Sequence, residues 1–339
     1  MKEINDNIDV LRLSNLAIGY KQKNGQKIVA RNINATLRRG ELTALLGSNG
    51  IGKSTLLRTL TRKQPALEGE IAFNDKPLLS YSGEELSKQI SIVLTERIEL
   101  KNTTVFEVIA MGRAPYTGFW GTLCDEDRRI VNEAIELIKI DHLRSRLIDS
   151  LSDGERQKVM IAKALTQQTP IIILDEPTAF LDFPSKVDMM QILHRLTREL
   201  GKTVLLSTHD LDLALQIADR IWLLDTNNKL HIGIPEDLSL DGTLSNFFER
   251  KGIVFDRDNG LFRIENTPDR KLKMRGHGHR YAMVRKAMLR NGIAANAFVE
   301  HSESDMPFEL EVNKEQILLH HSDGKTVEVN KIEELLEYI

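Results

Sequence analysis

The octapeptide GSNGIGKS, residues 47–54, constrains this chain more than any other stretch. It fits the pattern G-x-x-x-x-G-K-[ST] without a mismatch. A short apolar run at 41–46 precedes it, and leucines at helical spacing follow it, so it lies between a predicted buried strand and a predicted helix. A glycine-rich turn with a chance lysine is the alternative interpretation, and the strand–turn–helix setting argues against it. The stretch therefore predicts a site for nucleotide phosphates.

The residue types in this stretch suit a triphosphate. Glycines let the backbone curl so that successive N–H groups point at phosphate oxygens. The positive end of the following helix adds to this attraction. Lys53 is expected to reach the β- and γ-phosphates, and the Ser54 hydroxyl is expected to bind Mg²⁺. The predicted nucleotide-binding residues of the loop are Gly47, Ser48, Asn49, Gly50, Ile51, Gly52, Lys53, Ser54 and Thr55.

Composition and charge exclude several other classes. The formal net charge of −3 gives no basic field, so nucleic acid is not expected as a partner. The single cysteine, Cys124, rules out an internal disulfide and suits a reducing compartment; we expect it to be a half-buried packing residue. The first residues lack the apolar core of a signal peptide, and no run approaches the ~18 apolar residues that span a bilayer. We expect a cytoplasmic chain.

The order of predicted elements indicates a mainly parallel α/β fold. Strand-like runs over 10–46, with Asn24-Gly25 as a hairpin signal, predict an antiparallel β subdomain. Apolar runs at 171–176 and 203–208 alternate with helices, as in a sheet that is buried on both faces. A helical subdomain is expected at about 95–165, and it includes an amphipathic helix over 125–140 whose N-cap would be Asp125.

The chain is long enough for two domains. We expect a nucleotide-binding domain over 1–249 and a small α+β appendage over 250–339. The basic, polar stretch 270–280 suggests a linker, and the remainder of the appendage predicts a helix over 282–289, short strands over 308–329 and a final helix over 332–339. The sequence gives no role for this appendage.

Two carboxylates end the apolar run 171–176. Asp175 would hold Mg²⁺, directly or through water, and Glu176 would orient the water that attacks the γ-phosphate or accept its proton. His209 follows the next buried run. It is either a packed core residue or a contact to the nucleotide, and its place at the end of a strand parallel to 171–176 favours the nucleotide.

Ser152 and Glu155 fit the capping box S-x-x-E ahead of a helical run over 156–165. This arrangement brings a helix N-terminus, a hydroxyl and a glycine N–H together as an anion site. Taken alone, the pattern is simply a capped helix. Tyr20, at the end of a predicted strand, either stacks on a base or packs within its hairpin, and the residues alone leave both possibilities open.

In combination, GSNGIGKS, LSDGE, IIILDEPTAFLD and STHD resemble the nucleotide-binding subunit of ABC transporters, in spacing as well as content, over about residues 10–240. The resemblance implies a head-to-tail dimer that holds each ATP between residues 47–54 of one copy and 152–154 of the other. It assigns the signature motif to Ser152, Asp153, Gly154 and Glu155, of which Asp153 and Glu155 depart from the family's LSGGQ. It also assigns the Walker B pair to Asp175 and Glu176, the D-loop to Asp182, the switch histidine to His209 and adenine stacking to Tyr20.

Three further features bear on coupling and substrate. Thr95 occupies the position where the family usually has glutamine, and its shorter side chain implies that any metal contact runs through water. Residues 111–118 resemble the GRxPY stretch of importers for iron–siderophores, haem and cobalamin, although ordinary packing of such a loop is the alternative. The tail histidines are expected to be solvated rather than metal ligands, because their spacing fixes no ligand set; they are His277, His279, His320 and His321.

We therefore expect an ATPase subunit that uses ATP and Mg²⁺, pairs with a second copy and docks on a permease at the inner face of the plasma membrane. Its transporter would import an iron–siderophore or a related iron chelate, haem or cobalamin. Two alternatives stay open: a soluble ABC-type ATPase of translation or repair, and a regulatory module in which ATP only switches a partner contact. An exporter is disfavoured because no membrane segment is fused to the chain.

Overall fold

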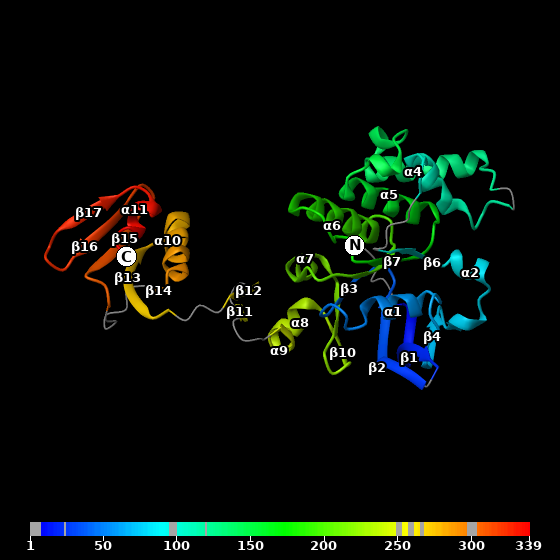
Figure 1. Cartoon of the computed structure of the whole chain (residues 1–339), viewed down its shortest axis with the longest axis horizontal. Coiled ribbons are helices and arrows are strands. Elements are labelled where there is room, and N and C mark those ends of the chain that lie inside the picture. Colours follow the sequence, from blue (N-terminus) through cyan, green and yellow to red (C-terminus); the bar gives the residue numbers. More distant parts are fainter. Residues whose placement is uncertain are drawn as a thin grey trace, which may run out of the picture. The chain divides into compact units, whose positions relative to one another are not determined.

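A six-stranded sheet forms the centre of the first of two units into which the chain divides, Met1–Phe247 and Phe248–Ile339 (Figure 1). The computed structural model describes residues 8–23, 25–94, 100–118, 121–248, 253–256, 261–264, 268–296 and 304–339. Three of the sheet's strands, β3 (Leu42–Leu46), β7 (Ile171–Asp175) and β8 (Thr203–Ser207), are buried at every residue. Full burial explains their mostly apolar sequences, because helices cover both faces of a parallel sheet.

The strand order in this sheet is β10-β9-β3-β8-β7-β6. The remaining strands are β6 (Ile90–Val93), β9 (Arg220–Leu224) and β10 (Leu230–Gly233), and only β10 runs antiparallel to its neighbour. The helices that alternate with these strands are α1 (Lys53–Leu60), α6 (Phe183–Arg198) and α7 (Leu211–Ile217), and α8 (Pro235–Leu240) and α9 (Thr243–Phe248) follow the sheet. The predicted α/β architecture is confirmed.

An antiparallel sheet of order β2-β1-β4-β5 adjoins this core. Its strands are β1 (Asp9–Gln22), β2 (Gly25–Arg38), β4 (Glu68–Phe73) and β5 (Lys76–Pro77), followed by the turn η1 (Leu78–Ser80) and helix α2 (Gly83–Ser87). The predicted hairpin is confirmed by the pairing of Gln22 with Gly25, while Asn24 lies outside the described residues. Leu11, Leu45 and Ile173 belong to one apolar core that both sheets share.

Helices fill the segment between β6 and β7, and Figure 1 shows α4 and α5 gathered at one end of this unit. The elements are α3 (Val105–Ala110), η2 (Met111–Arg113), α4 (Asp125–Ile138), η3 (Asp141–Leu143), η4 (Ile148–Ser150) and α5 (Asp153–Thr166). A buried ion pair joins them: Arg113 Nε lies 2.8 Å from Asp127 Oδ1. The Arg113 guanidinium also donates to Thr166 O and stacks on the Tyr116 ring. The GRxPY stretch thus ties the helices to one another.

Two details at the start of α4 correct the sequence analysis. The N-cap is Cys124, not Asp125, because the carboxylate of Asp127 reaches back to the Cys124 N–H, 3.1 Å away. Cys124 is exposed rather than half-buried. The helix also ends at Ile138 instead of residue 140, because Lys139 adopts the left-handed conformation, with φ of 61°.

The second unit contains a five-stranded sheet of order β14-β13-β15-β16-β17. Its strands are β13 (Arg270–Gly276), β14 (Ile293–Asn296), β15 (Phe308–Val312), β16 (Ile317–His321) and β17 (Thr326–Val329), and its helices are α10 (Gly278–Arg290) and α11 (Ile332–Leu336). A separate two-stranded ladder is formed by β11 (Ile253–Asp256) and β12 (Leu261–Ile264). Val284 of α10 and Leu335 of α11 enter one core with the sheet, so both helices contribute to the same apolar layer.

The predicted linker over 270–280 is wrong in its first part. Residues Arg270–Gly276 form β13, an inner strand that pairs in parallel with β14 and β15. Leu272 and Met274 are buried, whereas Lys271, Lys273 and Arg275, which alternate with them, are more exposed. The strand buries one face only, so its alternating basic residues masked it as a polar stretch.

Replacing Asp127 with Asn should destabilise the protein at neutral pH by about 3 kcal/mol, because Arg113 would lose its buried counter-charge. The hydrogen bond from Arg113 lowers the pKa of Asp127 below its ordinary value of 3.8. The stabilisation is therefore complete above pH 3.8 and is lost as the pH falls through the lower pKa of the folded state. The deficit in unfolding free energy, measured by denaturant titration, should shrink on acidification.

Asp125→Asn is the matched control for this variant, since Asp125 is exposed on the same first turn. It should change the unfolding free energy by less than about 0.5 kcal/mol. A deficit for Asp127→Asn that stays constant with pH, or that Asp125→Asn matches, would contradict the account.

Candidate functional site

Loops from three parallel strands meet at one edge of the six-stranded sheet. Residues 47–52 follow β3, Asp175 ends β7, and Ser207 ends β8, where His209 comes two residues later. Asp175 and Ser207 are paired in register across β7 and β8. The carboxyl ends of parallel strands lie at the same edge, which brings these distant parts of the sequence together.

The phosphate loop turns directly into α1. Gly52 is the N-cap, with φ of 119°, and a Cβ at this position would lie 2.3 Å from Val29 Cγ1, so only glycine fits. Lys53 is buried, and its ammonium donates to the carbonyls of Gly47 at 2.8 Å and Ser48 at 3.3 Å. The loop backbone thus holds the lysine ammonium at the start of the helix.

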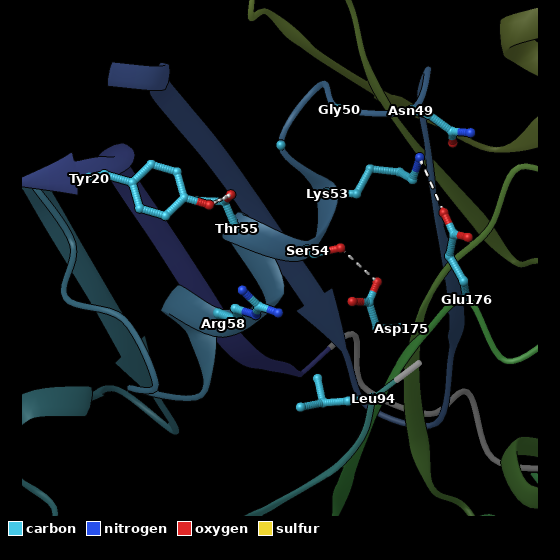
Figure 2. A pocket seen from close by; sticks show the side chains of 11 residues that line it. Tyr20, Asn49, Gly50, Lys53, Ser54, Thr55, Arg58, Leu94, Asp175 and Glu176 are labelled. Carbon is cyan, nitrogen blue, oxygen red and sulfur yellow. Dashed lines mark hydrogen bonds and ion pairs between the residues drawn. The ribbon is translucent and has the colours of Figure 1, made fainter. Parts of the chain in front are cut away.

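Oxygen ligands converge beside this lysine. Ser54 Oγ lies 3.2 Å from Asp175 Oδ1, and Figure 2 shows the two side chains facing each other. A hydroxyl and a carboxylate are hard oxygen donors of the kind Mg²⁺ prefers, so these residues fit the ion. Nowhere in the described part of the chain do three His, Cys, Asp or Glu side chains gather as a metal site.

Glu176 occupies the space between the lysine and the histidine. Its carboxylate lies 3.6 Å from Lys53 Nζ and 3.5 Å from His209 Nδ1 (the lysine contact is drawn in Figure 2). His209 is 49% exposed, so it is not a packed core residue. The arrangement places a carboxylate and an imidazole beside the lysine of the predicted phosphate loop.

Tyr20 marks the other end of the site. It is 43% exposed, and its hydroxyl lies 2.9 Å from Thr55 Oγ1 (Figure 2). A cavity of about 450 Å³ extends from this ring to the carboxylates. It is lined by Tyr20, Asn49, Gly50, Gly52, Lys53, Ser54, Thr55, Arg58, Leu94, Asp175 and Glu176.

Some predicted loop residues lie outside this lining, and some lining residues were not predicted. Gly47 and Ser48 bind Lys53 through their carbonyls, and Ile51 packs against the core. Arg58 and Leu94 line the cavity without having been singled out. Helical spacing from Ser54 could have indicated Arg58, since residues four apart share one face of α1.

The signature residues form a separate surface at the start of α5. The Ser152 hydroxyl accepts the Glu155 N–H at 3.3 Å, and the Glu155 carboxylate accepts the Ser152 N–H at 2.8 Å, so the predicted capping box is confirmed. The bond from the Ser152 N–H lowers the pKa of Glu155. Ser152 is exposed, Asp153 and Gly154 are partly exposed, and none of these residues lines the described cavity.

Two other predicted positions are Asp182 and Thr95. The Asp182 carboxylate caps α6 by accepting the Ser185 N–H at 3.0 Å. Thr95 lies outside the described residues.

One residue that the sequence analysis missed is Ser207, whose buried hydroxyl lies 2.6 Å from Asp175 Oδ1. Its position two residues before His209, on the strand beside Asp175, is visible only once the strand pairing is known.

The parallel sheet, the loop-to-helix turn and the carboxylates at the strand ends define a P-loop ATPase. Comparisons with known proteins show which family of P-loop ATPases this is. The family profile described as ABC transporter matches residues 30–179, and the profile described as Iron ABC transporter C-terminal domain matches residues 269–339.

Relatives and solved structures indicate the same family as the profiles. An uncharacterized ABC transporter ATP-binding protein of Methanocaldococcus jannaschii is 35% identical over 78% of this chain and 90% of its own length. The petrobactin import ATP-binding protein FpuC of Bacillus anthracis is 34% identical over 74% of this chain and 91% of its own. The cassette MJ0796 bound to ADP and Pi superposes with a TM-score of 0.58 at 28% identity, over 66% of this chain and 98% of that one. The chain belongs to the ATP-binding proteins of ABC transporters, and it is an ATPase.

Lys53→Ala should abolish nucleotide binding, because it removes the cation that we expect to bind the β- and γ-phosphates. Titration with a fluorescent ATP analogue measures this directly. Lys229→Ala, which removes an exposed lysine, is the control and should bind like the wild type. An unchanged affinity in Lys53→Ala would refute the assignment of the phosphate site.

Substitutions at Tyr20 separate base stacking from the hydroxyl contact with Thr55. Tyr20→Ala should weaken ATP binding roughly tenfold, the scale of one lost base–aromatic stack. Tyr20→Phe keeps the ring and should bind ATP within about twofold of the wild type. Equal losses in both variants, measured in the same titration, would assign the effect of Tyr20 to its hydroxyl contact with Thr55 and not to stacking.

Proposed function

We propose that this chain is the ATP-hydrolysing subunit of an importer for iron chelates such as ferric siderophores. The observation that carries the proposal is the similarity to named iron-import subunits of a chain whose phosphate loop, Lys53 and strand-end carboxylates line one cavity. FpuC is one of them, and the iron(3+)-hydroxamate import ATP-binding protein FhuC of Bacillus subtilis, 33% identical over 70% of this chain and 87% of its own, is another. The C-terminal profile named for iron transporters supports the same substrate class.

The geometry supports a division of labour among the site residues. Lys53 and the loop N–H groups neutralise charge on the β- and γ-phosphates. Ser54 and Asp175 would hold Mg²⁺, which supplies charge neutralisation at the phosphate oxygens. Glu176 orients the attacking water or accepts its proton, and His209 contacts the γ-phosphate. Tyr20 stacks on the adenine. Catalysis is then mainly positioning and electrostatic stabilisation.

A second copy of the chain would complete each site. The signature residues are accessible at the start of α5 and do not line the cavity of their own chain. Phe180 and Phe183, on either side of Leu181 and Asp182, are 85% and 70% exposed, which is a large apolar surface beside the proposed D-loop. A solved ABC transporter cassette, 27% identical with a TM-score of 0.59 over 66% of this chain and 98% of that one, is described as dimeric.

Coupling to transport requires a permease. None of the described helices has the length and apolar character needed to cross a bilayer. We place the chain at the inner face of the plasma membrane, bound to permease subunits through the helical segment and the neighbouring Thr95 position. ATP closes the dimer, hydrolysis and product release open it, and the motion passes to the permease.

Glu176→Gln should trap an ATP-bound dimer, because the closed state forms but hydrolysis does not reopen it. Size exclusion with ATP and Mg²⁺ should show the dimer for this variant. The control Glu136→Gln, an exposed position on α4, should behave like the wild type. If Glu176→Gln stays monomeric at saturating ATP, the dimer mechanism is wrong.

The transport role is tested on membranes. The tagged chain, purified with its native membranes and mild detergent, should bring down permease subunits, and cells should take up ⁵⁵Fe-loaded siderophore in an ATPase-dependent way. Loss of uptake in Glu176→Gln but not in Glu236→Gln, an exposed position on α8 outside the helical segment, is the expected result. Association with cytosolic partners alone, or uptake unaffected by Glu176→Gln, would favour the regulatory or soluble alternatives.

A further inference from the structure

We infer that Ser207 is a positioning residue that holds both carboxylates of the nucleotide site. Ser207 is the last residue of β8 and is fully buried. Its hydroxyl oxygen lies 2.6 Å from Asp175 Oδ1 and 2.9 Å from the backbone nitrogen of Glu176. The inference rests on the proposed roles of Asp175 in metal binding and Glu176 in hydrolysis.

The chemistry of the two partners fixes the direction of both hydrogen bonds. An ionised carboxylate can only accept a hydrogen bond, and a backbone N–H can only donate one. The Ser207 hydroxyl therefore donates to Asp175 and accepts from Glu176. The Ser207 carbonyl reinforces the second contact, because it lies 3.1 Å from the same Glu176 nitrogen. One residue thus fixes a side chain and a stretch of backbone together.

The bond to Asp175 controls the metal end of the site. Asp175 Oδ1 also accepts the Ser54 hydroxyl, so Ser207 at the end of β8 and Ser54 in the first turn of α1 approach the same carboxylate oxygen. Without the Ser207 hydroxyl, this buried carboxylate would lose a charge-assisted hydrogen bond and could rotate away from Ser54. A metal bound between Ser54 and Asp175 would then be held less tightly.

The bond to Glu176 controls the hydrolytic end. Glu176 has φ of 47°, the left-handed region that is unfavourable for a residue with a Cβ. The N–H bonds to Ser207 hold the backbone in this turn. This backbone conformation places the Glu176 carboxylate between Lys53 and His209. Ser207 therefore supports the conformation from which Glu176 acts.

The test compares Ser207→Ala with the conservative variant Ser207→Thr, which keeps the hydroxyl. Thr43→Val is a matched control: Thr43 is equally buried on the neighbouring β3, and its hydroxyl has no hydrogen-bond partner among the described residues. The affinity for a fluorescent ATP analogue is measured in Mg²⁺ and in EDTA. The Mg²⁺ concentration at half-maximal binding and the kcat of ATP hydrolysis are measured alongside.

Ser207→Ala should raise the Mg²⁺ requirement and lower kcat, each roughly tenfold, the scale of a lost hydrogen bond to a charged group. Its ATP affinity in EDTA should stay within about twofold of the wild type, because the phosphate loop is untouched. Ser207→Thr should recover most of both losses, and Thr43→Val should match the wild type. Should Ser207→Ala not fold, Ser207→Cys, which keeps a similar volume with a weak donor, replaces it in every comparison.

Two results would overturn the inference. One is an unchanged Mg²⁺ requirement in Ser207→Ala, and the other is a Ser207→Thr variant as impaired as Ser207→Ala. The outcome is separable from the proposed function. If wild-type binding of ATP does not depend on Mg²⁺, the proposed metal site itself fails. If the wild type depends on Mg²⁺ and Ser207→Ala depends on it equally, only the role of Ser207 fails.

Discussion

The parallel pairing of β3, β7 and β8 is the constraint on which the rest of the structure depends. It places the residues that follow each strand at one edge of the sheet. The Glu176 carboxylate therefore lies 3.6 Å from Lys53 Nζ and 3.5 Å from His209 Nδ1, although the three residues are far apart in the sequence. The strands themselves are wholly buried and mostly apolar, and each buried aliphatic side chain contributes about 1.5–3 kcal/mol to folding. Packing energy in the strands thereby fixes the geometry of a polar site.

One chain by itself lines only one side of the proposed nucleotide site. The chain supplies phosphate-binding backbone, a lysine, two carboxylates and an aromatic ring along one cavity, while its own signature residues at the start of α5 do not line it. An ATP bound here would present its outer side to solvent, where hydrolysis is poorly controlled. A second copy that brings residues 152–154 over the triphosphate would account for the open cavity and for the accessible signature residues. It would also account for the exposed Phe180 and Phe183.

Local patterns in the sequence were enough to predict the phosphate loop, the buried strands and the Ser152–Glu155 capping box, because each depends on neighbouring residues. Features that depend on tertiary contact were not predictable. The Asp127 carboxylate accepts the N–H of the N-cap Cys124 while also binding Arg113, and β13 keeps alternating lysines because only one of its faces is covered. Ser207 reads as an ordinary strand residue until its pairing with Asp175 is known. The roles of the site residues remain predictions.

The central claim is that each nucleotide site is completed by a second copy, and a structure of the chain with Mg²⁺ and a non-hydrolysable ATP analogue tests it most directly. The account predicts two chains arranged head to tail, with each triphosphate between residues 47–54 of one protomer and 152–154 of its partner. A chain that binds the analogue alone, or a dimer whose signature residues lie away from both nucleotides, would contradict it.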